Sequence, residues 1–161
     1  MMRLVERFNA LCAQVPLGLT LLIARLGIAG VFWRSGQTKV AGFALDPLAG
    51  RFELGWPRFS DSAIDLFRDE YRVPLLSPEV AATLATLAEH VFPMLLVLGL
   101  ATRASALALL GMTLVIQIFV YPDAWPTHGT WAAVLLVLVR FGAGAISLDH
   151  LLARRHISFS A

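Results

Sequence analysis

The fold of this chain is decided by residues 77–103, SPEVAATLATLAEHVFPMLLVLGLATR. The stretch is mostly apolar over about twenty residues, the length that a helix needs to cross the hydrocarbon layer of a bilayer. Ser77 offers a capping hydroxyl at its start, and the short turn 99–103 ends it. Near the middle lie an acid and a histidine, Glu89 and His90. An ionisable residue at the centre of a membrane span is costly, so Glu89 is a candidate functional residue.

Composition places the whole chain in the membrane class. Its 161 residues are 58% hydrophobic and 15% charged, whereas soluble domains are nearer half apolar and a quarter charged. A formal charge of +2 is too small to indicate a nucleic-acid partner. The single cysteine, Cys12, excludes an intramolecular disulfide and a paired-cysteine redox centre. Residues 1–16 lack a short apolar core with a small-residue cleavage site, so we expect no cleaved signal peptide.

Four apolar runs predict an all-α membrane protein, a four-transmembrane-helix bundle forming a single domain over 1–161. The expected spans are 17–40, 79–100, 103–121 and 130–146. A polar insertion, 41–78, separates the first two spans and is too long for a plain connection, so we expect it to cover something. Short amphipathic interfacial helices are expected at 1–15, after Ser60 and after Ser147.

The charges outside the spans predict the orientation. Four spans place both termini on one side, and the short segments there are rich in arginine: Arg3, Arg7, Arg103, Arg154 and Arg155. The opposite side carries an acid-rich insertion and a loop without lysine or arginine. Basic residues concentrate in cytoplasmic loops of membrane proteins, so we expect both termini in the cytoplasm.

Two other spans carry an arginine at a depth similar to that of Glu89. At 1.5 Å per residue, Arg25, Glu89 and Arg140 lie roughly 12–15 Å from the membrane surface. An unpaired charge at that depth costs about 2.5–3.5 kcal/mol, so we expect the three to form an inward-facing cluster. Arg25 shares one helical stripe with Ala29, Phe32 and Gly36. The cluster either fixes which helices pair or takes part in chemistry, and the sequence leaves both readings open.

The remaining polar candidates are few. His90 points away from Glu89 by about 100° around the helix, while His128 and Asp123 fall in the loop before the last span. Two ligands in a loop are too few to predict a metal, and one deep histidine does not predict haem. A quinone headgroup near Glu89, His90 or His128 would suit an apolar pocket with a few polar groups. We therefore expect no metal and no certain cofactor, with quinone as the candidate ligand.

Three segments together resemble the DoxX family of small bacterial membrane proteins. They are FWRSGQTKVAGF at 32–43, PMLLVLGLATR at 93–103 and GAGAISLD at 142–149. Besides Arg25 and Glu89, the residues that match the family pattern are Gly36, Lys39, Gly99, Thr102, Arg103, Gly142, Gly144, Ser147 and Asp149. Ala143 stands where many relatives have proline. The resemblance implies a four-helix bundle in the bacterial inner membrane; some relatives are membrane subunits of oxidoreductase systems, including thiosulfate:quinone oxidoreductase.

Three functional hypotheses follow. The first is an accessory membrane subunit of a redox or stress-response system, with a soluble or membrane redox partner. The second is a non-catalytic scaffold or assembly factor, and the third is a small transporter or proton relay. We do not expect the isolated chain to be an enzyme. Glycine-lined faces in the first and last spans make a homodimer a further candidate.

Overall fold

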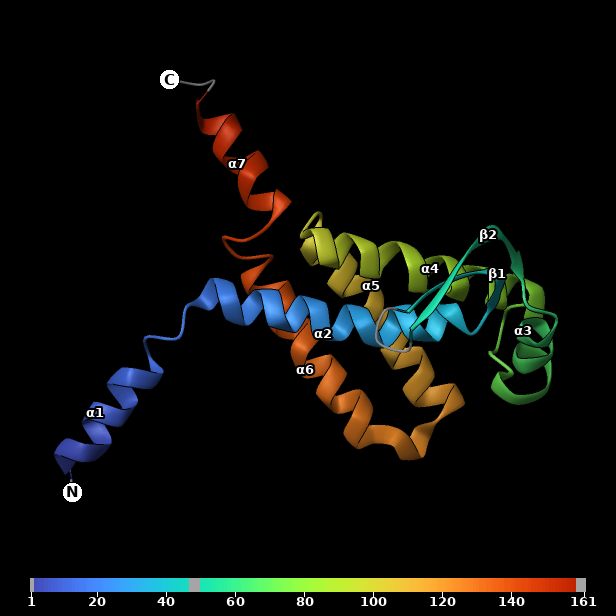
Figure 1. The fold of residues 1–161 in the computed structure, drawn as a ribbon. Helices are drawn as coiled ribbons and strands as arrows, with labels where there is room; N and C mark the ends of the chain where they lie inside the picture. The colour runs from blue at the N-terminus through green and yellow to red at the C-terminus, as the bar shows by residue number, and fades with distance from the viewer. Residues whose placement is uncertain (1, 47–49, 159–161) are drawn as a thin grey trace.

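The structure is a computed structural model that describes residues 2–46 and 50–158, and it is mostly helical (Figure 1). The helices are α1 (Met2–Cys12), α2 (Leu17–Gln37), α3 (Asp61–Asp65), α4 (Pro78–Leu98), α5 (Thr102–Val115), α6 (Trp125–Phe141) and α7 (Leu148–Ser158). Three shorter helical segments are η1 (Leu66–Tyr71), η2 (Ile116–Val120) and η3 (Pro122–Ala124). Two strands, β1 (Val40–Asp46) and β2 (Arg51–Phe59), form an antiparallel hairpin.

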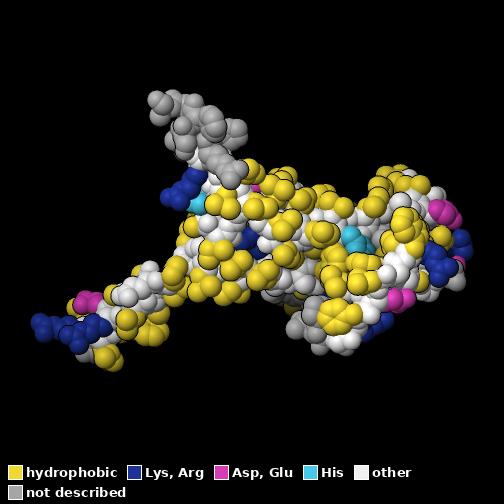
Figure 2. Space-filling model, turned by 45° about the horizontal axis from the view of Figure 1, so that its top comes forward, with side chains coloured by type: hydrophobic (Ala, Val, Ile, Leu, Met, Phe, Trp, Pro, Cys, Tyr) yellow, Lys and Arg dark blue, Asp and Glu magenta, His cyan; other side chains and the backbone are white. Residues whose placement is uncertain are grey.

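Three helices are long and apolar enough to cross a membrane, among the residues that the structure describes. They are α2, α4 and the continuous helix formed by α5 and η2, Thr102–Val120. Together with α6 they enclose a small core of large apolar side chains: Leu21, Ile28, Phe32, Leu96, Leu109, Leu135 and Leu138. Many other apolar side chains of these helices point outward. On the face shown in Figure 2, charged side chains gather toward the two ends of the molecule and apolar ones cover the middle, as expected for a surface that contacts lipid.

The helix α4 begins where its sequence signals predict. The Ser77 hydroxyl accepts a hydrogen bond from the Val80 backbone N–H at 3.4 Å, and Pro78 occupies the first helical position. The helix ends at Gly99, which adopts the left-handed conformation (φ 65°) that ends many helices. The predicted antiparallel pair of helices at 79–100 and 103–121 is therefore present as α4 and α5–η2.

The insertion at 41–78 differs from the prediction. A helix does follow Ser60, as α3 and η1, but the hairpin of β1 and β2 was not predicted. Its cross-strand pairs include Phe43 with Leu54 and Leu45 with Phe52. Apolar residues alternate along both strands, and such alternation indicates a half-exposed strand. The prediction for this segment did not take that pattern into account.

The predicted last span at 130–146 is displaced in the structure. The helix α6 begins at Trp125, because Pro126 fits the first turn of a helix. It ends at Phe141, because Gly142 has a φ of 74° and breaks the helical path. Gly142 and Gly144 therefore lie in a turn after the helix, and His128 lies within the helix rather than in a loop.

Candidate functional site

The helices α2 and α4 approach closely at Gly36. A methyl group at this position would meet the His90 ring at 2.8 Å and the Glu89 Cβ at 3.0 Å. Contacts that close would force the His90 ring or one of the helices to shift, so glycine permits this spacing. The close approach brings the end of α2 against Glu89, the acid that the sequence singled out.

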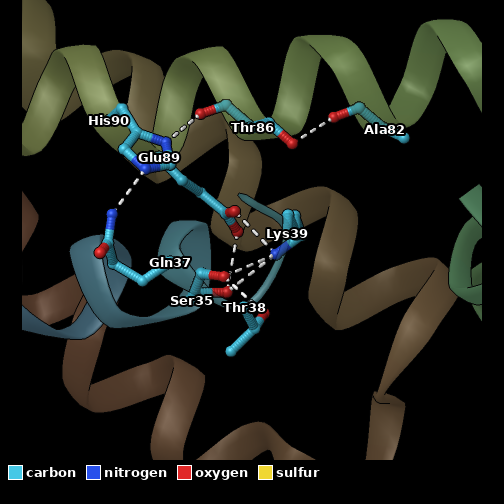
Figure 3. Close-up of polar contacts among 8 residues, drawn as sticks. All are labelled: Ser35, Gln37, Thr38, Lys39, Ala82, Thr86, Glu89 and His90. Atoms are coloured by element: carbon cyan, nitrogen blue, oxygen red, sulfur yellow. Dashed lines mark hydrogen bonds and ion pairs between the residues drawn. The ribbon is translucent and has the colours of Figure 1, made fainter. Parts of the chain in front are cut away.

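Glu89 forms a buried ion pair with Lys39, which follows the end of α2 (Figure 3). The Lys39 Nζ lies 2.7 Å from Glu89 Oε2, and both side chains are less than 5% exposed. Lys39 Nζ also donates to the Ser35 carbonyl at 3.1 Å and to Ser35 Oγ at 3.2 Å. Ser35 Oγ in turn donates to Glu89 Oε1 at 2.9 Å. Both carboxylate oxygens and the ammonium are thus engaged, which a buried ion pair requires.

His90 belongs to a neighbouring hydrogen-bond chain and does not touch the ion pair. Its Nδ1 lies 2.7 Å from the Thr86 carbonyl, which can only accept, so Nδ1 carries the proton. Its Nε2 lies 3.0 Å from Gln37 Nε2 and accepts from that amide. Gln37 Oε1 accepts from the Leu45 backbone N–H at 2.8 Å, which fixes the orientation of the amide. The contacts assign a neutral His90 that ties α4 to the end of α2 and to β1.

A cavity of about 340 Å³ lies beside the ion pair. Its wall is mostly apolar and comes from α2, η1, α4, the α5–η2 helix and α6. Six polar or ionisable side chains line it: Ser35, Lys39, Tyr71, Glu89, Tyr121 and His128. Cavities of this size and character are typical of small-molecule sites.

Two tyrosines join the insertion to the helix ends at one side of the cavity. The Tyr121 hydroxyl donates to Glu70 Oε1 at 2.5 Å, and its ring lies 5.7 Å from that of Tyr71 in an edge-to-face contact. The hydrogen bond to Glu70 raises the pKa of the Tyr121 phenol, and burial raises the pKa of Tyr71. Both hydroxyls are therefore protonated near neutral pH and can act as hydrogen-bond donors.

His128 lines the same cavity from α6 and is buried. Its Nδ1 lies 2.7 Å from Gln117 Oε1, while Gln117 Nε2 donates to the Pro122 carbonyl at 2.7 Å. That second bond fixes the amide, so His128 Nδ1 is the donor and Nε2 carries the lone pair. Asp123 is exposed in η3 and is not among the residues that line the cavity. The described residues contain no group of three metal-ligating side chains.

Arg25 is buried in a second polar cluster at the other end of the bundle. Its guanidinium donates to the carbonyls of Leu96 at 3.0 Å and Val97 at 3.4 Å, and to that of Ile146. The last carbonyls of a helix have no partner within the helix, so Arg25 satisfies the end of α4. It also ties α4 to the segment that follows α6.

Asp149 completes this second cluster. Its carboxylate accepts from the backbone N–H groups of Ala101 at 2.8 Å and Thr102 at 3.0 Å, at the start of α5. Its own N–H donates to the Gly99 carbonyl at 2.8 Å. An acid at a helix N-terminus satisfies unpaired N–H groups and the helix dipole. We call the group of Arg25, Gly99, Thr102 and Asp149 the interhelical joint.

The predicted cluster of Arg25, Glu89 and Arg140 does not form. Helical side chains point toward the N-terminus of their own helix, so Arg25 and Glu89, on antiparallel helices, point to opposite ends of the bundle. Arg140 is exposed on α6, and its guanidinium lies 5.5 Å from the Phe141 ring. Equal depth along the chain was therefore a poor guide to pairing.

The sequence reading missed Lys39 as the partner of Glu89. The stripe of Arg25, Ala29, Phe32 and Gly36 is buried, and the next position on it is Lys39, which is 2% exposed. Extending the stripe by three residues would have placed Lys39 inside the bundle. Tyr71 and Tyr121 carried no comparable signal.

A family model described as DoxX matches residues 20–122, more than half of the chain. The chain belongs to the DoxX family, and its apolar helices make it a multi-pass membrane protein. No curated protein and no solved structure matches the chain. Of the residues that carried the resemblance, Gly36, Lys39 and Glu89 gather beside the cavity, and Gly99, Thr102 and Asp149 gather in the interhelical joint.

Proposed function

We propose that this protein is an accessory membrane subunit of a redox or stress-response system and that its cavity holds a quinone headgroup. The cavity is the observation that supports the proposal. Its volume of about 340 Å³ and its apolar walls suit a ring that enters from lipid. A quinone supplies two-electron redox chemistry to such a system.

The polar groups of the wall suit such a headgroup. The neutral Tyr71 hydroxyl can donate to a quinone carbonyl, and His128 Nε2 can accept from a quinol hydroxyl. Lys39 and Glu89 supply a fixed polar wall, since their charges are already neutralised by each other. Phe32 and Trp131, whose ring centroids lie 5.5 Å apart, supply aromatic surface for stacking.

Filling the cavity is expected to weaken quinone binding. Replacing Ala88, which lines the cavity, by leucine should lower the affinity for decylubiquinone at least tenfold, or about 1.4 kcal/mol, because the added side chain occupies the ring's space. Quenching of tryptophan fluorescence by the quinone measures the affinity in detergent or lipid discs. The matched control is Ala133→Leu, the same change at an exposed position of α6. Equal affinities of the two variants would contradict the proposal.

Native mass spectrometry of the protein released from mild detergent is the companion measurement. A bound mass that matches a quinone, or a partner chain, would support the redox-subunit function. The same spectrum reports the oligomeric state. We propose a homodimer that packs through Gly27 and Gly30, because no atom lies within 4 Å of a methyl group built on either glycine.

A non-catalytic scaffold is the second candidate, and the local pairing of the buried charges favours it. Lys39 pairs with Glu89 and donates to both Ser35 oxygens, so the ion pair can serve only to hold the end of α2 against α4. A protein that copurifies with phospholipid alone and binds no added decylubiquinone would favour this function. A small transporter or proton relay has no comparable observation in its favour.

We also propose that α6 is the fourth span of an inner-membrane bundle. Its 17 residues are at the lower limit for a transmembrane helix. Both terminal segments leave the bundle at the end opposite the insertion in Figure 1, which suits both termini in the cytoplasm. The exposed apolar and basic side chains of α1 suit a helix on the membrane surface. Labelling of Cys12 from outside intact cells by an impermeant thiol reagent would overturn this orientation.

A further inference from the structure

The outer strand of the hairpin exposes a set of large apolar side chains. Phe52, Leu54 and Trp56 on β2 are 65%, 83% and 85% exposed. In the paired part of the hairpin, Phe52 and Leu54 share a face with Leu45 and Phe43, their cross-strand partners. An apolar surface of this kind on a folded protein marks a contact with lipid or another chain.

The opposite face of the hairpin is charged and faces the bundle at the end of β1. It carries the pairs Asp46–Arg51 and Ala44–Glu53. The Asp46 side chain is only 16% exposed and lies 3.4 Å from the Arg34 guanidinium of α2. At the end of β1 the hairpin thus turns the Asp46 carboxylate toward α2, while the large apolar side chains of β2 stay exposed, the reverse of a hairpin that floats in water.

Contacts with α2 fix the level of the hairpin relative to the membrane. The Trp33 indole N–H donates to the Leu45 carbonyl at 2.8 Å, and Gln37 Oε1 accepts from the Leu45 N–H. Trp33 lies about 6 Å before the end of α2, at 1.5 Å per residue. The 21 residues of α2 match the hydrocarbon thickness of about 30 Å. The end of β1 is therefore level with the last turns of a membrane-spanning helix (Figure 1).

We infer that the apolar face of the hairpin is a lipid-binding surface, embedded at the boundary between headgroups and acyl chains. The end of β1 is hydrogen-bonded to Trp33 on the membrane-spanning helix α2, and tryptophan and phenylalanine favour this boundary. Arg51 and Arg58, both exposed, can reach lipid phosphates from beside it. Leu75 and Leu76, just before the start of α4, expose further apolar side chains. A two-stranded hairpin has unpaired backbone edges, so it lies at the boundary and no deeper.

The test places an environment-sensitive fluorophore on each face of β2 in turn. NBD is attached to Leu54→Cys or, as the matched control, to Glu53→Cys, each in the full chain with Cys12→Ser and in lipid discs holding one copy. Residue 53 is adjacent to Leu54 and lies on the charged face. The expected result is emission at shorter wavelength at position 54, with several-fold stronger quenching by shallow doxyl-labelled lipid than by a deep one. Position 53 should emit as in water.

Water-like emission at both positions would overturn the inference. So would protection of position 54 that appears only in discs with two copies, because a second chain would then be the occupant. Should the labelled variants fail to fold, the intact chain and Trp56→Phe are compared with brominated lipid. The emission of Trp56, obtained as the difference between the two proteins, should be strongly quenched by the brominated lipid. Unquenched Trp56 emission would overturn the inference.

Discussion

Replacing Lys39 by methionine is expected to lower the free energy of unfolding by about 3–5 kcal/mol. The change leaves the buried Glu89 carboxylate without its cation at 2.7 Å, while the methylene stem is kept. Unfolding in mixed micelles by titration with dodecyl sulfate measures the difference. The matched control is Arg34→Met near the end of α2, where the arginine of the ion pair with Asp46 is 68% exposed. That change should cost less than about 1 kcal/mol.

The double variant Lys39→Met with Glu89→Met separates the pair's net contribution from the penalty for an orphan charge. Replacing both partners by apolar groups is often neutral, so the double variant should lie within about 1 kcal/mol of the native protein. The two single changes should then be strongly non-additive. Additive losses, or a Lys39 variant as stable as the Arg34 control, would show that the two side chains do not pair in the membrane.

The apolar runs and caps made most of the helices predictable. Twenty or so apolar residues after Ser77-Pro78 leave few alternatives to a spanning helix, and α4 follows that signal. The end of α6 was misjudged because Gly142 and Gly144 read equally well as small residues of a span and as turn residues. Only their backbone conformation, φ 74° and 77°, shows that they end the helix.

The site was less predictable, because it depends on directions and on tertiary packing. Counting residues gives the depth of Arg25 and Glu89 along their helices but not the direction in which each side chain points. The two side chains point to opposite ends of the bundle, and this direction separates them. The cavity combines side chains from five segments, and Tyr71 and Tyr121 meet only because η1 folds against the end of η2. The hairpin could have been predicted from the sequence, because its apolar residues alternate on both sides of the turn.

The interhelical joint gives the second large expected effect. Gly99→Ala should destabilise the protein by roughly 3–5 kcal/mol. Gly99 has a φ of 65°, which costs other residues about 1–2 kcal/mol. Its new methyl group would also clash with the Arg25 guanidinium and lie 2.5 Å from the Ser147 Cβ. Arg25 would have to leave the carbonyl of Leu96, and a hydrogen bond from a charged group to a buried carbonyl contributes about 1.5–3 kcal/mol.

The matched control for this prediction is Gly111→Ala, the same substitution inside α5. A methyl group there meets no atom within 4 Å, and the position is exposed and helical. Alanine is favoured over glycine in a helix by about 0.5–1 kcal/mol, so this variant should be as stable as the native protein or slightly more so. If Gly99→Ala lowered the free energy of unfolding no more than Gly111→Ala does, the connection between α4 and α5 would not depend on the interhelical joint. The buried contacts of Arg25 and Asp149 would then need an explanation other than holding the ends of these two helices.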